Sequence, residues 1–458
     1  MPPKRAEVVV CGAGIAGIAA AYWLAVRCGV GDVVLVDERP PLSLTSDKST
    51  EAYRNWWPGP DDAMIRVMNR SIDLLEELAR ESDNVFLLNR RGYVYATAEA
   101  ARWRELETAA QVGSSMGAGP LRSHTRDTGA YHPVAAAGWE GEPTGADLVV
   151  DRALLREHFP YLTDRVVGVL HVRRCGWFSG QQLGMYLLER ARERGVRLIP
   201  AHLEAVESAA GRVCRVSLRA GETQHAIETS CFVNAAGPYL RSVAAKLGVE
   251  LPVFSERHLK ACFPDTRGVV PRHAPLLIWE DAQELAWAEE ERALLAESSD
   301  TSWLLAPFPP AVHMRPEGGL GSDNILLLWP YDAAPVQEDF PLPEEPTFAE
   351  VVMRGMSTMV PGLRAYFDAL PKSYVDGGYY TKTQENRFLS CPLPVEGSFL
   401  LGALSGYGLM VACGAAEILA AHVTGGALPD YAAAFALERY EDSAYCDRMR
   451  AWGSSGQL

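Results

Sequence analysis

The chain lacks the features of nucleic-acid-binding and membrane-spanning proteins. Its 458 residues carry a formal net charge of −15 and contain no dense run of lysine and arginine. Binding to nucleic-acid phosphates requires a basic surface, so we expect no nucleic-acid partner. The apolar stretch 15–26 is shorter than the roughly 18 residues that a membrane-spanning helix needs. We therefore expect no membrane span.

Cysteine and histidine patterns typical of disulfide frameworks and metal sites are also missing. The nine cysteines form no Cys-x-x-Cys pair, and the ten histidines form no His-x-x-x-His pair. We expect reduced thiols in a reducing compartment and no metal ion. Residues 1–5 run directly into an apolar segment and leave no room for a cleaved signal, which favours the cytoplasm. The sequence also has no internal repeat and no low-complexity segment.

What is present is the composition of a globular enzyme. Hydrophobic residues make up 48% of the chain and charged residues 22%, so large-scale disorder is not expected. A domain usually has about 100–200 residues, so two or three domains are expected.

The most informative motif lies at the N-terminus. The apolar run 7–11 leads into Gly12-x-Gly14-x-x-Gly17 and then into a helix of small residues. In this pattern the glycines allow a tight turn, a close approach to a pyrophosphate and close packing of helix on strand. A second apolar run ends in Asp37, and an acidic residue at this distance can bind ribose hydroxyls. The segment predicts a dinucleotide-binding βαβ unit.

Patterns further along the chain predict the remaining organisation. Apolar periodicity favours helices, while short β-rich runs favour strands. The stretch 251–361, rich in proline and tryptophan, suggests a separate antiparallel sheet over a ligand cleft, and the polar stretch 111–145 suggests a long insertion or lid. The expected helices are 61–81, 180–195, an acidic stretch at 280–297 and one running to about residue 422; the expected strands are 92–96, 196–199, 213–218, 226–229 and 231–235, with a turn at 205–207.

Two later segments extend the dinucleotide signature. Residues 233–238, Val-Asn-Ala-Ala-Gly-Pro, end an apolar strand, and Gly402-x-x-x-Gly406-x-Gly408 opens a helix. In this order, the motifs resemble the D-amino-acid oxidase (DAO) superfamily of flavoenzymes, in particular its glycine, sarcosine and dimethylglycine oxidase-like branch. The resemblance spans nearly the whole chain.

The resemblance implies an α/β fold with two domains. One is a Rossmann-like FAD-binding domain of the glutathione-reductase type, and the other is a substrate domain built on an antiparallel β-sheet. The implied FAD-binding parts are 1–90, 151–250 and 371–458, the last with the C-terminal helices. The implied substrate parts are 91–150, with the insertion, and 251–370.

The resemblance also assigns residues to the cofactor. The first motif and Asp37 hold the ADP half of FAD, Val206 clamps the adenine, and the late glycines open a helix that faces the flavin ring. The hydroxyl-rich segment 45–54 follows the ribityl chain and carries no His or Cys, so non-covalent FAD is expected. The implied cofactor-binding residues are Gly12, Gly14, Ile15, Ala16, Gly17, Asp37, Glu38, Arg39, Thr45, Ser46, Lys48, Ser49, Thr50, Val206, Ala236, Gly237, Gly402, Gly406, Tyr407, Gly408, Leu409 and Met410.

For the substrate, Arg54 occupies the position of an arginine that grips a carboxylate in the sarcosine oxidase pattern. The alternative is a surface arginine paired with Glu51 or with another acidic neighbour. Met410 stands where the pattern has a second cation, and no lysine lies near Leu328, where the pattern has one for oxygen activation. Lys382 and Lys48 are candidate replacements. Arg54, Tyr380, Lys382 and Met410 are therefore the implied catalytic residues.

The function implied by the resemblance is oxidation of a C–N bond of an amino acid or amine by hydride transfer to flavin N5, which gives an imine. An FAD-dependent 2-hydroxy-acid or glycerol-phosphate dehydrogenase remains an alternative. So does a flavin-binding subunit of a hetero-oligomeric amine oxidase. The sequence leaves open the substrate, the electron acceptor and whether the protein is a monomer or a homo-oligomer.

Overall fold

A six-stranded sheet forms the centre of one half of the molecule. A computed structural model describes residues 2–125 and 131–452 of the chain. The sheet is parallel except at one edge, where β20 (Leu389–Pro392) runs antiparallel to β21 (Ser398–Gly402). From β21 its order continues through β13 (Phe232–Asn234), β1 (Val8–Cys11), β2 (Val33–Asp37) and β9 (Arg197–Pro200).

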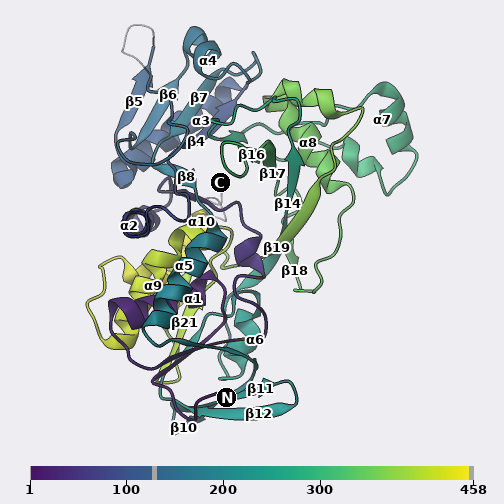
Figure 1. Cartoon of the computed structure of the whole chain (residues 1–458). Coiled ribbons are helices and arrows are strands. Elements are labelled where there is room, and N and C mark those ends of the chain that lie inside the picture. The colour runs from purple at the N-terminus through teal and green to yellow at the C-terminus, as the bar shows by residue number, and fades with distance from the viewer. Residues whose placement is uncertain (1, 126–130, 453–458) are drawn as a thin grey trace.

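Apolar helices cover this sheet. The helix α1 (Ile15–Tyr22) is buried along its whole length and packs against α5 (Gly180–Glu193) and α9 (Gly408–Thr424). The helix α2 (Ala63–Glu81) packs on α9 through its apolar stripe. Figure 1 shows α1, α5 and α9 together in the half that contains β21. This burial on every side explains why α1 contains only small and apolar side chains, apart from its one tyrosine.

The other half is built on a ten-stranded mixed sheet. Its order is β18, β14, β17, β16, β15, β4, β7, β6, β5, and β19 pairs with β14 off this path. Helices α3 (Ala100–Gly113), α4 (Arg152–His158) and α8 (Phe348–Met359) accompany it. The strands are β4 (Tyr93–Thr97), β5 (Leu121–His124), β6 (Ala146–Val149), β7 (Gly168–Val172), β14 (Phe254–Pro264), β15 (Leu276–Trp279), β16 (Val312–Pro316), β17 (Asn324–Leu328), β18 (Pro335–Val336) and β19 (Tyr374–Lys382).

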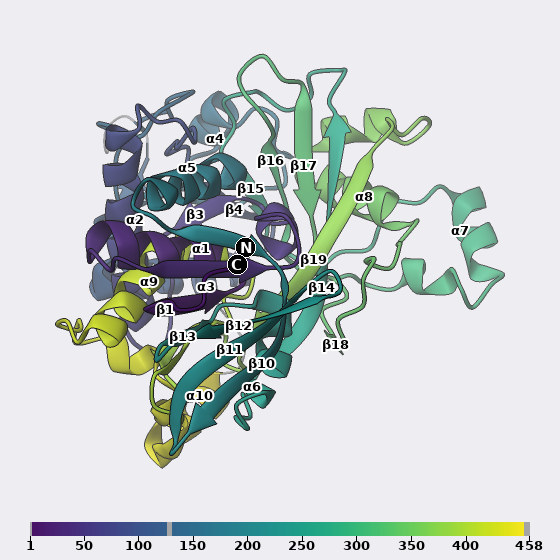
Figure 2. The ribbon, with the colours of Figure 1, turned by 60° about the horizontal axis from the view of Figure 1, so that its bottom comes forward.

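Smaller elements complete the chain. The strands β10 (His202–Ala209), β11 (Arg212–Ala220) and β12 (Thr223–Glu228) form an antiparallel meander, and β3 (Ala52–Arg54) pairs with β8 (Cys175–Trp177). The short helix α6 (Leu240–Ala245) follows β13, and α10 (Ser443–Trp452) lies near the C-terminus. The helix α7 (Glu289–Ala296) lies at the outer edge of the molecule in both Figure 1 and Figure 2.

Three expectations from the sequence need correction. Of the acidic stretch 280–297 only 289–296 is helical, because Glu280 and Gln283 hydrogen-bond through their backbones to other strands and loops. The expected turn 205–207 lies inside β10, where it pairs with β11. The stretch 111–145 includes the end of α3 and the edge strand β5, so it is not wholly a loop; its residues 126–130 lie outside the described part.

Two segments lie in the ten-stranded sheet although the expected ranges assign them to the FAD-binding domain. One is β19, which lies within 371–458 and pairs with β14. The other contains the helix α4 and the strand β7, which lie within 151–250, a range expected for the FAD-binding domain. However, β7 pairs with β4 and β6 in the ten-stranded sheet. Within the described residues, no helix is both long and apolar enough to cross a membrane.

Candidate active site

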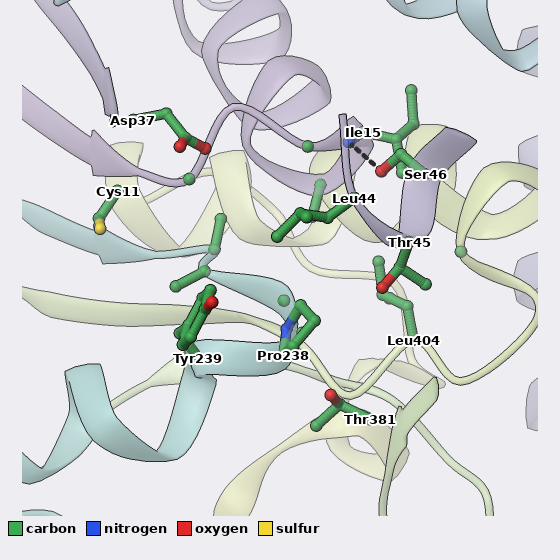
Figure 3. A pocket seen from close by; sticks show the side chains of 18 of the residues that line it. Cys11, Ile15, Asp37, Leu44, Thr45, Ser46, Pro238, Tyr239, Thr381 and Leu404 are labelled. Atoms are coloured by element: carbon green, nitrogen blue, oxygen red, sulfur yellow. Dashed lines mark hydrogen bonds between the residues drawn. The ribbon is translucent and has the colours of Figure 1, made fainter. Parts of the chain in front are cut away.

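A cavity of about 430 Å³ lies at the carboxyl ends of the parallel strands. This is the edge at which open α/β sheets bind ligands. Asp37 and Cys11 lie at one end of the cavity in Figure 3, and Thr45, Ser46 and Leu404 lie at the other. Residues far apart in the sequence therefore enclose one elongated space.

The glycine loop is shaped by close backbone contacts. Gly12 has φ +108°, and a Cβ added there would lie 2.3 Å from the Ala235 carbonyl oxygen. A Cβ on Gly17 would lie 1.8 Å from the Gly12 carbonyl oxygen. Any larger residue at either position would displace α1 or β13 from the loop. The sequence prediction that Gly17 permits close packing of helix on strand agrees with this geometry.

Polar groups hold the loop from both sides of the cavity. The Asp37 carboxylate accepts hydrogen bonds from the backbone N–H of Ala13 at 2.7 Å and of Arg39 at 2.9 Å. The Ser46 hydroxyl accepts one from the Ile15 N–H at 2.9 Å (Figure 3). Asp37 thereby joins the glycine loop to the end of β2, and its carboxylate lies on the cavity wall.

This architecture fits a dinucleotide such as FAD. The N-terminus of α1 supplies backbone N–H groups and partial positive charge where a pyrophosphate would lie. The absence of side chains at Gly12 and Gly14 leaves room for the pyrophosphate. Space at Gly14 is limited, since a Cβ there would lie 3.2 Å from the Ser46 hydroxyl oxygen. At the far end the buried Ser405 hydroxyl lines the cavity and has no hydrogen-bond partner among the described residues. A ligand can supply that partner.

Most of the cofactor residues expected from the sequence line this cavity. They come from β1, the glycine loop, β2, the segment 45–49, the turn after β13 and the start of α9. The lining residues among those expected are Gly12, Gly14, Ile15, Ala16, Asp37, Glu38, Arg39, Thr45, Ser46, Ser49, Ala236, Gly237, Gly402, Gly406, Gly408 and Leu409.

Six expected cofactor residues do not line it. Gly17 packs against the glycine loop, and Thr50, Tyr407 and Met410 line a second cavity described below. The other two are Val206 and Lys48. Val206 is buried within β10, and the cavity wall is instead formed by Ala201, His202 and Leu203 at the start of that strand. The expectation assumed a turn at Val206, but pairing with β11 extends the strand through it. The Lys48 ammonium pairs with Asp47 and Asp376, each at 2.6 Å, and does not line the cavity.

A second, smaller cavity adjoins the first. Tyr380 and Gly406 line both cavities, and a Cβ on Gly406 would lie 2.5 Å from the Tyr380 ring. The expected residues Thr50, Arg54, Tyr407 and Met410 line this second space rather than the first. We call it the substrate cavity; its other lining residues are Tyr93, His258, Leu259, Leu276, His313, Leu328, Trp329 and Pro330.

Arg54 is the cationic residue in the described lining of the substrate cavity. It lies at the end of β3, is 2% exposed and donates a hydrogen bond from Nη1 to the Tyr95 hydroxyl at 3.1 Å. Its guanidinium lies 4.6 Å from the centroid of the Trp57 ring, a cation–π distance. Glu51, the expected structural partner, instead lies 3.5 Å from the Arg315 guanidinium.

Two histidines in the substrate cavity were not identified from the sequence. The His258 ring stacks on Tyr380 with centroids 4.1 Å apart, and its Nε2 lies 3.1 Å from a Glu256 carboxylate oxygen. The His313 Nδ1 lies 2.9 Å from the Ala311 carbonyl oxygen. Burial lowers the pKa of both, that of His313 to about 4, so both are neutral at pH 7. Only the pairing of β14 with β19 brings His258 to this cavity.

Lys382 does not line either cavity. It is buried at the end of β19, and its ammonium lies 3.2 Å from the Glu256 carboxylate. Lys260 is the lysine opposite Leu328 in the β14–β17 register, and its ammonium donates to the Asp47 carbonyl oxygen at 2.8 Å. The described lining of the substrate cavity contains no lysine.

Comparisons with known proteins agree with this architecture. The L-proline dehydrogenase of P. horikoshii has an 18% identical sequence and a TM-score of 0.73, with 96% of this chain and 99% of that one covered. The glycine oxidase of Geobacillus kaustophilus has 14% identity and a TM-score of 0.71, with 95% and 99% covered. At these identities the likeness shows a shared fold.

Curated relatives are larger proteins. The mitochondrial dimethylglycine dehydrogenase of Rattus norvegicus is 23% identical over 299 residues, which are 64% of this chain and 31% of that protein. The mitochondrial sarcosine dehydrogenase of Mus musculus is 26% identical over 266 residues, 56% of this chain and 25% of that protein. The chain thus aligns with less than a third of the length of either relative.

A family model described as FAD dependent oxidoreductase (DAO) matches residues 7–422, which include both ends of the cofactor cavity. The matched range covers far more than half of the chain. With the glycine loop, Asp37 and the turn at Gly406 all in place around one cavity, the chain belongs to the DAO family of FAD-dependent oxidoreductases.

Proposed function

We propose that this enzyme oxidises a C–N bond of an amino acid or of a secondary or tertiary amine and gives an imine. The observation that carries the proposal is the position of Arg54 in a cavity that shares Tyr380 and Gly406 with the cofactor cavity. A substrate held there would lie beside the end of the cofactor cavity that Tyr380 and Gly406 line. The matched relatives include dehydrogenases named for proline, dimethylglycine and sarcosine, which supports the substrate class.

Each part of the substrate cavity has a role in the proposal. The Arg54 guanidinium binds the substrate carboxylate through two parallel hydrogen bonds. The aromatic rings of Tyr93, Tyr407 and Trp329 surround the apolar part of the substrate and exclude water. The neutral rings of His258 and His313 add no charge that would compete with Arg54 for the carboxylate.

FAD, when bound, supplies the hydride acceptor, and the protein orients the substrate toward it. The substrate amine must be uncharged when the hydrogen of the neighbouring C–H bond leaves as a hydride equivalent. In this proposal the amine enters the cavity uncharged, because burial lowers the pKa of His258 and makes its ring a weak acceptor of an ammonium proton. The described lining of the substrate cavity contains no cysteine, serine or lysine, which is consistent with a chemistry that needs positioning more than covalent catalysis.

A 2-hydroxy-acid dehydrogenase is the second candidate, since Arg54 would bind the carboxylate of a hydroxy acid equally well. The two functions differ in the group that loses the hydride. A flavin-binding subunit of a hetero-oligomeric amine oxidase is a further alternative, because the matched relatives extend well beyond this chain.

Anaerobic bleaching of the flavin tests these alternatives directly. We expect small amino acids or N-methylated amino acids to reduce the flavin of the purified protein, and matched 2-hydroxy acids to leave it oxidised. Reduction by hydroxy acids alone would replace the proposed function with the second candidate. Reduction only after a partner protein is added would favour the subunit alternative.

A further inference from the structure

A buried carboxylate joins the C-terminal part of the chain to the loop between β19 and β20. Glu385 has a side chain that is 3% exposed. Its Oε1 accepts hydrogen bonds from the Arg439 guanidinium and the Tyr440 hydroxyl, each at 2.8 Å, and from the Tyr445 hydroxyl at 3.0 Å. Arg439 also donates to the carbonyl oxygens of Arg387 and Phe388. The loop 383–388 is thus attached to residues 439–445 by both its side chains and its backbone.

The same loop contacts the wall of the substrate cavity. Asn386 has φ +58°, a left-handed conformation that costs free energy unless neighbouring contacts enforce it. Its carbonyl oxygen accepts a hydrogen bond from the Tyr407 hydroxyl at 2.9 Å. Tyr407 lines the substrate cavity, and its ring packs edge-on against Trp57 with centroids 5.1 Å apart. Trp57 in turn lies under the Arg54 guanidinium.

We propose that Glu385 is a positioning residue for the substrate cavity. Through the loop 383–388 it places the Asn386 carbonyl that holds Tyr407, and Tyr407 supports Trp57 beneath Arg54. The inference rests on the proposed function in one respect, namely that Arg54 binds a carboxylate. The contacts themselves form a continuous path from residues 439–445 to the cavity, and none of them depends on the identity of the substrate.

Two variants interrupt this path at different points. Glu385→Gln removes the charge that binds Arg439, and Tyr407→Phe removes the hydroxyl but keeps the ring against Trp57. We expect each to weaken acetate binding, read from the flavin spectrum of the holoenzyme, by about 2- to 10-fold, the loss typical of one hydrogen bond. KM for an amino-acid substrate should rise more than kcat falls. The double variant should lose no more affinity for acetate than the single variant with the larger loss, since both substitutions act on one path.

Glu417→Gln is the matched control. Glu417 lies on α9 and forms an ion pair with Arg70, but it contacts neither the loop nor the cavity in the described structure. Its loss should leave acetate binding unchanged, whatever it does to the melting temperature. A lower melting temperature for Glu385→Gln with wild-type acetate binding would make Glu385 purely structural and overturn the proposal. If Glu385→Gln does not fold, unchanged acetate binding by Tyr407→Phe has the same meaning.

Hydrogen exchange separates this proposal from the proposed function. We expect Glu385→Gln to increase backbone exchange in peptides that cover 54–57 and 403–411, and this readout needs no substrate. That increase in a protein whose flavin no amine reduces would support the positioning role and refute the amine oxidation. An increase confined to 436–452 would overturn the positioning role even in an active amine dehydrogenase.

Discussion

At the scale of single residues, the proposed binding of a substrate carboxylate by Arg54 can be tested by substitution. A charge-assisted hydrogen bond contributes about 1.5–3 kcal/mol, so Arg54→Met should lower kcat/KM by roughly 10- to 150-fold. The flavin should stay bound, because Arg54 lines the substrate cavity and not the cofactor cavity. Stopped-flow reduction of the flavin measures the effect. Arg66→Met, at an exposed arginine paired with Asp430, is the control. Equal kcat/KM for wild type and Arg54→Met would show that Arg54 is structural.

Asp37 gives a second prediction at this scale. Its carboxylate lines the cavity and accepts hydrogen bonds from two backbone N–H groups, that of Ala13 in the glycine loop and that of Arg39 just after β2. Asp37→Ala should weaken FAD binding by roughly 10- to 150-fold, again from the loss of about 1.5–3 kcal/mol. Titration of apoprotein with FAD measures the affinity. Asp32→Ala removes a carboxylate that pairs with Arg197 at the surface and should have no such effect. Identical titrations for the two variants would contradict the role of Asp37.

Local sequence patterns predicted single residues unevenly. The glycines and Asp37 were identifiable because their roles depend on backbone geometry within one βαβ unit. His258 and His313 were not, because each reaches the substrate cavity only through long-range pairing of strands. For the same reason, nothing in the sequence near Lys382 indicated its ion pair with Glu256, across the β14–β19 register. Arg54 was predicted by family resemblance, and the structure supplies its surroundings.

At the scale of elements, the contact between α1 and the turn after β1 gives a prediction. A methyl group on Gly17 would overlap the Gly12 carbonyl, at 1.8 Å, so Gly17→Ala must push α1 away from the loop. We expect little bound flavin and a lower melting temperature. Gly31→Ala is the matched control, since its added Cβ meets no atom within 4 Å. Flavin content measured by absorbance in both purified variants decides the point. Full flavin content in Gly17→Ala would mean that α1 can shift without losing the site.

Elements were predicted well where the pattern was local and poorly where tertiary contacts override it. The amphipathic stripe of α2 and the apolar run of β4 were visible in the sequence. The acidic stretch before α7 has helix-forming residues. Even so, Glu280 donates its backbone N–H to the Ala96 carbonyl, and this pairing of β15 with β4 inside the sheet holds it out of the helix. Val206 shows the same effect for a strand, since β11 extends β10 through the expected turn.

At the scale of the whole molecule, the attachment of the cofactor is testable. The described lining of the cofactor cavity includes Cys11, which lies at the end of β1, and burial raises its pKa to about 12. Such a thiol is protonated at pH 7 and a poor nucleophile. We therefore expect non-covalent FAD. Precipitation of the yellow protein with acid should release the flavin into the supernatant. A coloured pellet after washing would show covalent attachment.

The electron acceptor is also a property of the assembled molecule. The substrate cavity has no lysine in its described lining, and the Lys260 ammonium opposite Leu328 is bound to backbone carbonyl oxygens. We expect slow reoxidation of the reduced flavin by oxygen and faster reoxidation by an artificial acceptor dye. Mixing substrate-reduced enzyme with air-saturated buffer, and separately with the dye, compares the two rates. Faster reaction with oxygen than with the dye would mean that a cation outside the lining of the substrate cavity, such as Lys260, promotes the reaction with oxygen.

The cofactor cavity is enclosed by stretches of chain that lie far apart in the sequence, among them those around residues 12, 236 and 406. No fragment that lacks one of them can form the complete site. FAD therefore binds the assembled native state far better than the unfolded chain, and at 100 times its Kd such a ligand adds about 2.7 kcal/mol to the free energy of unfolding. The supply of flavin in the cell would then set how long this protein survives proteolysis, apart from any turnover it performs.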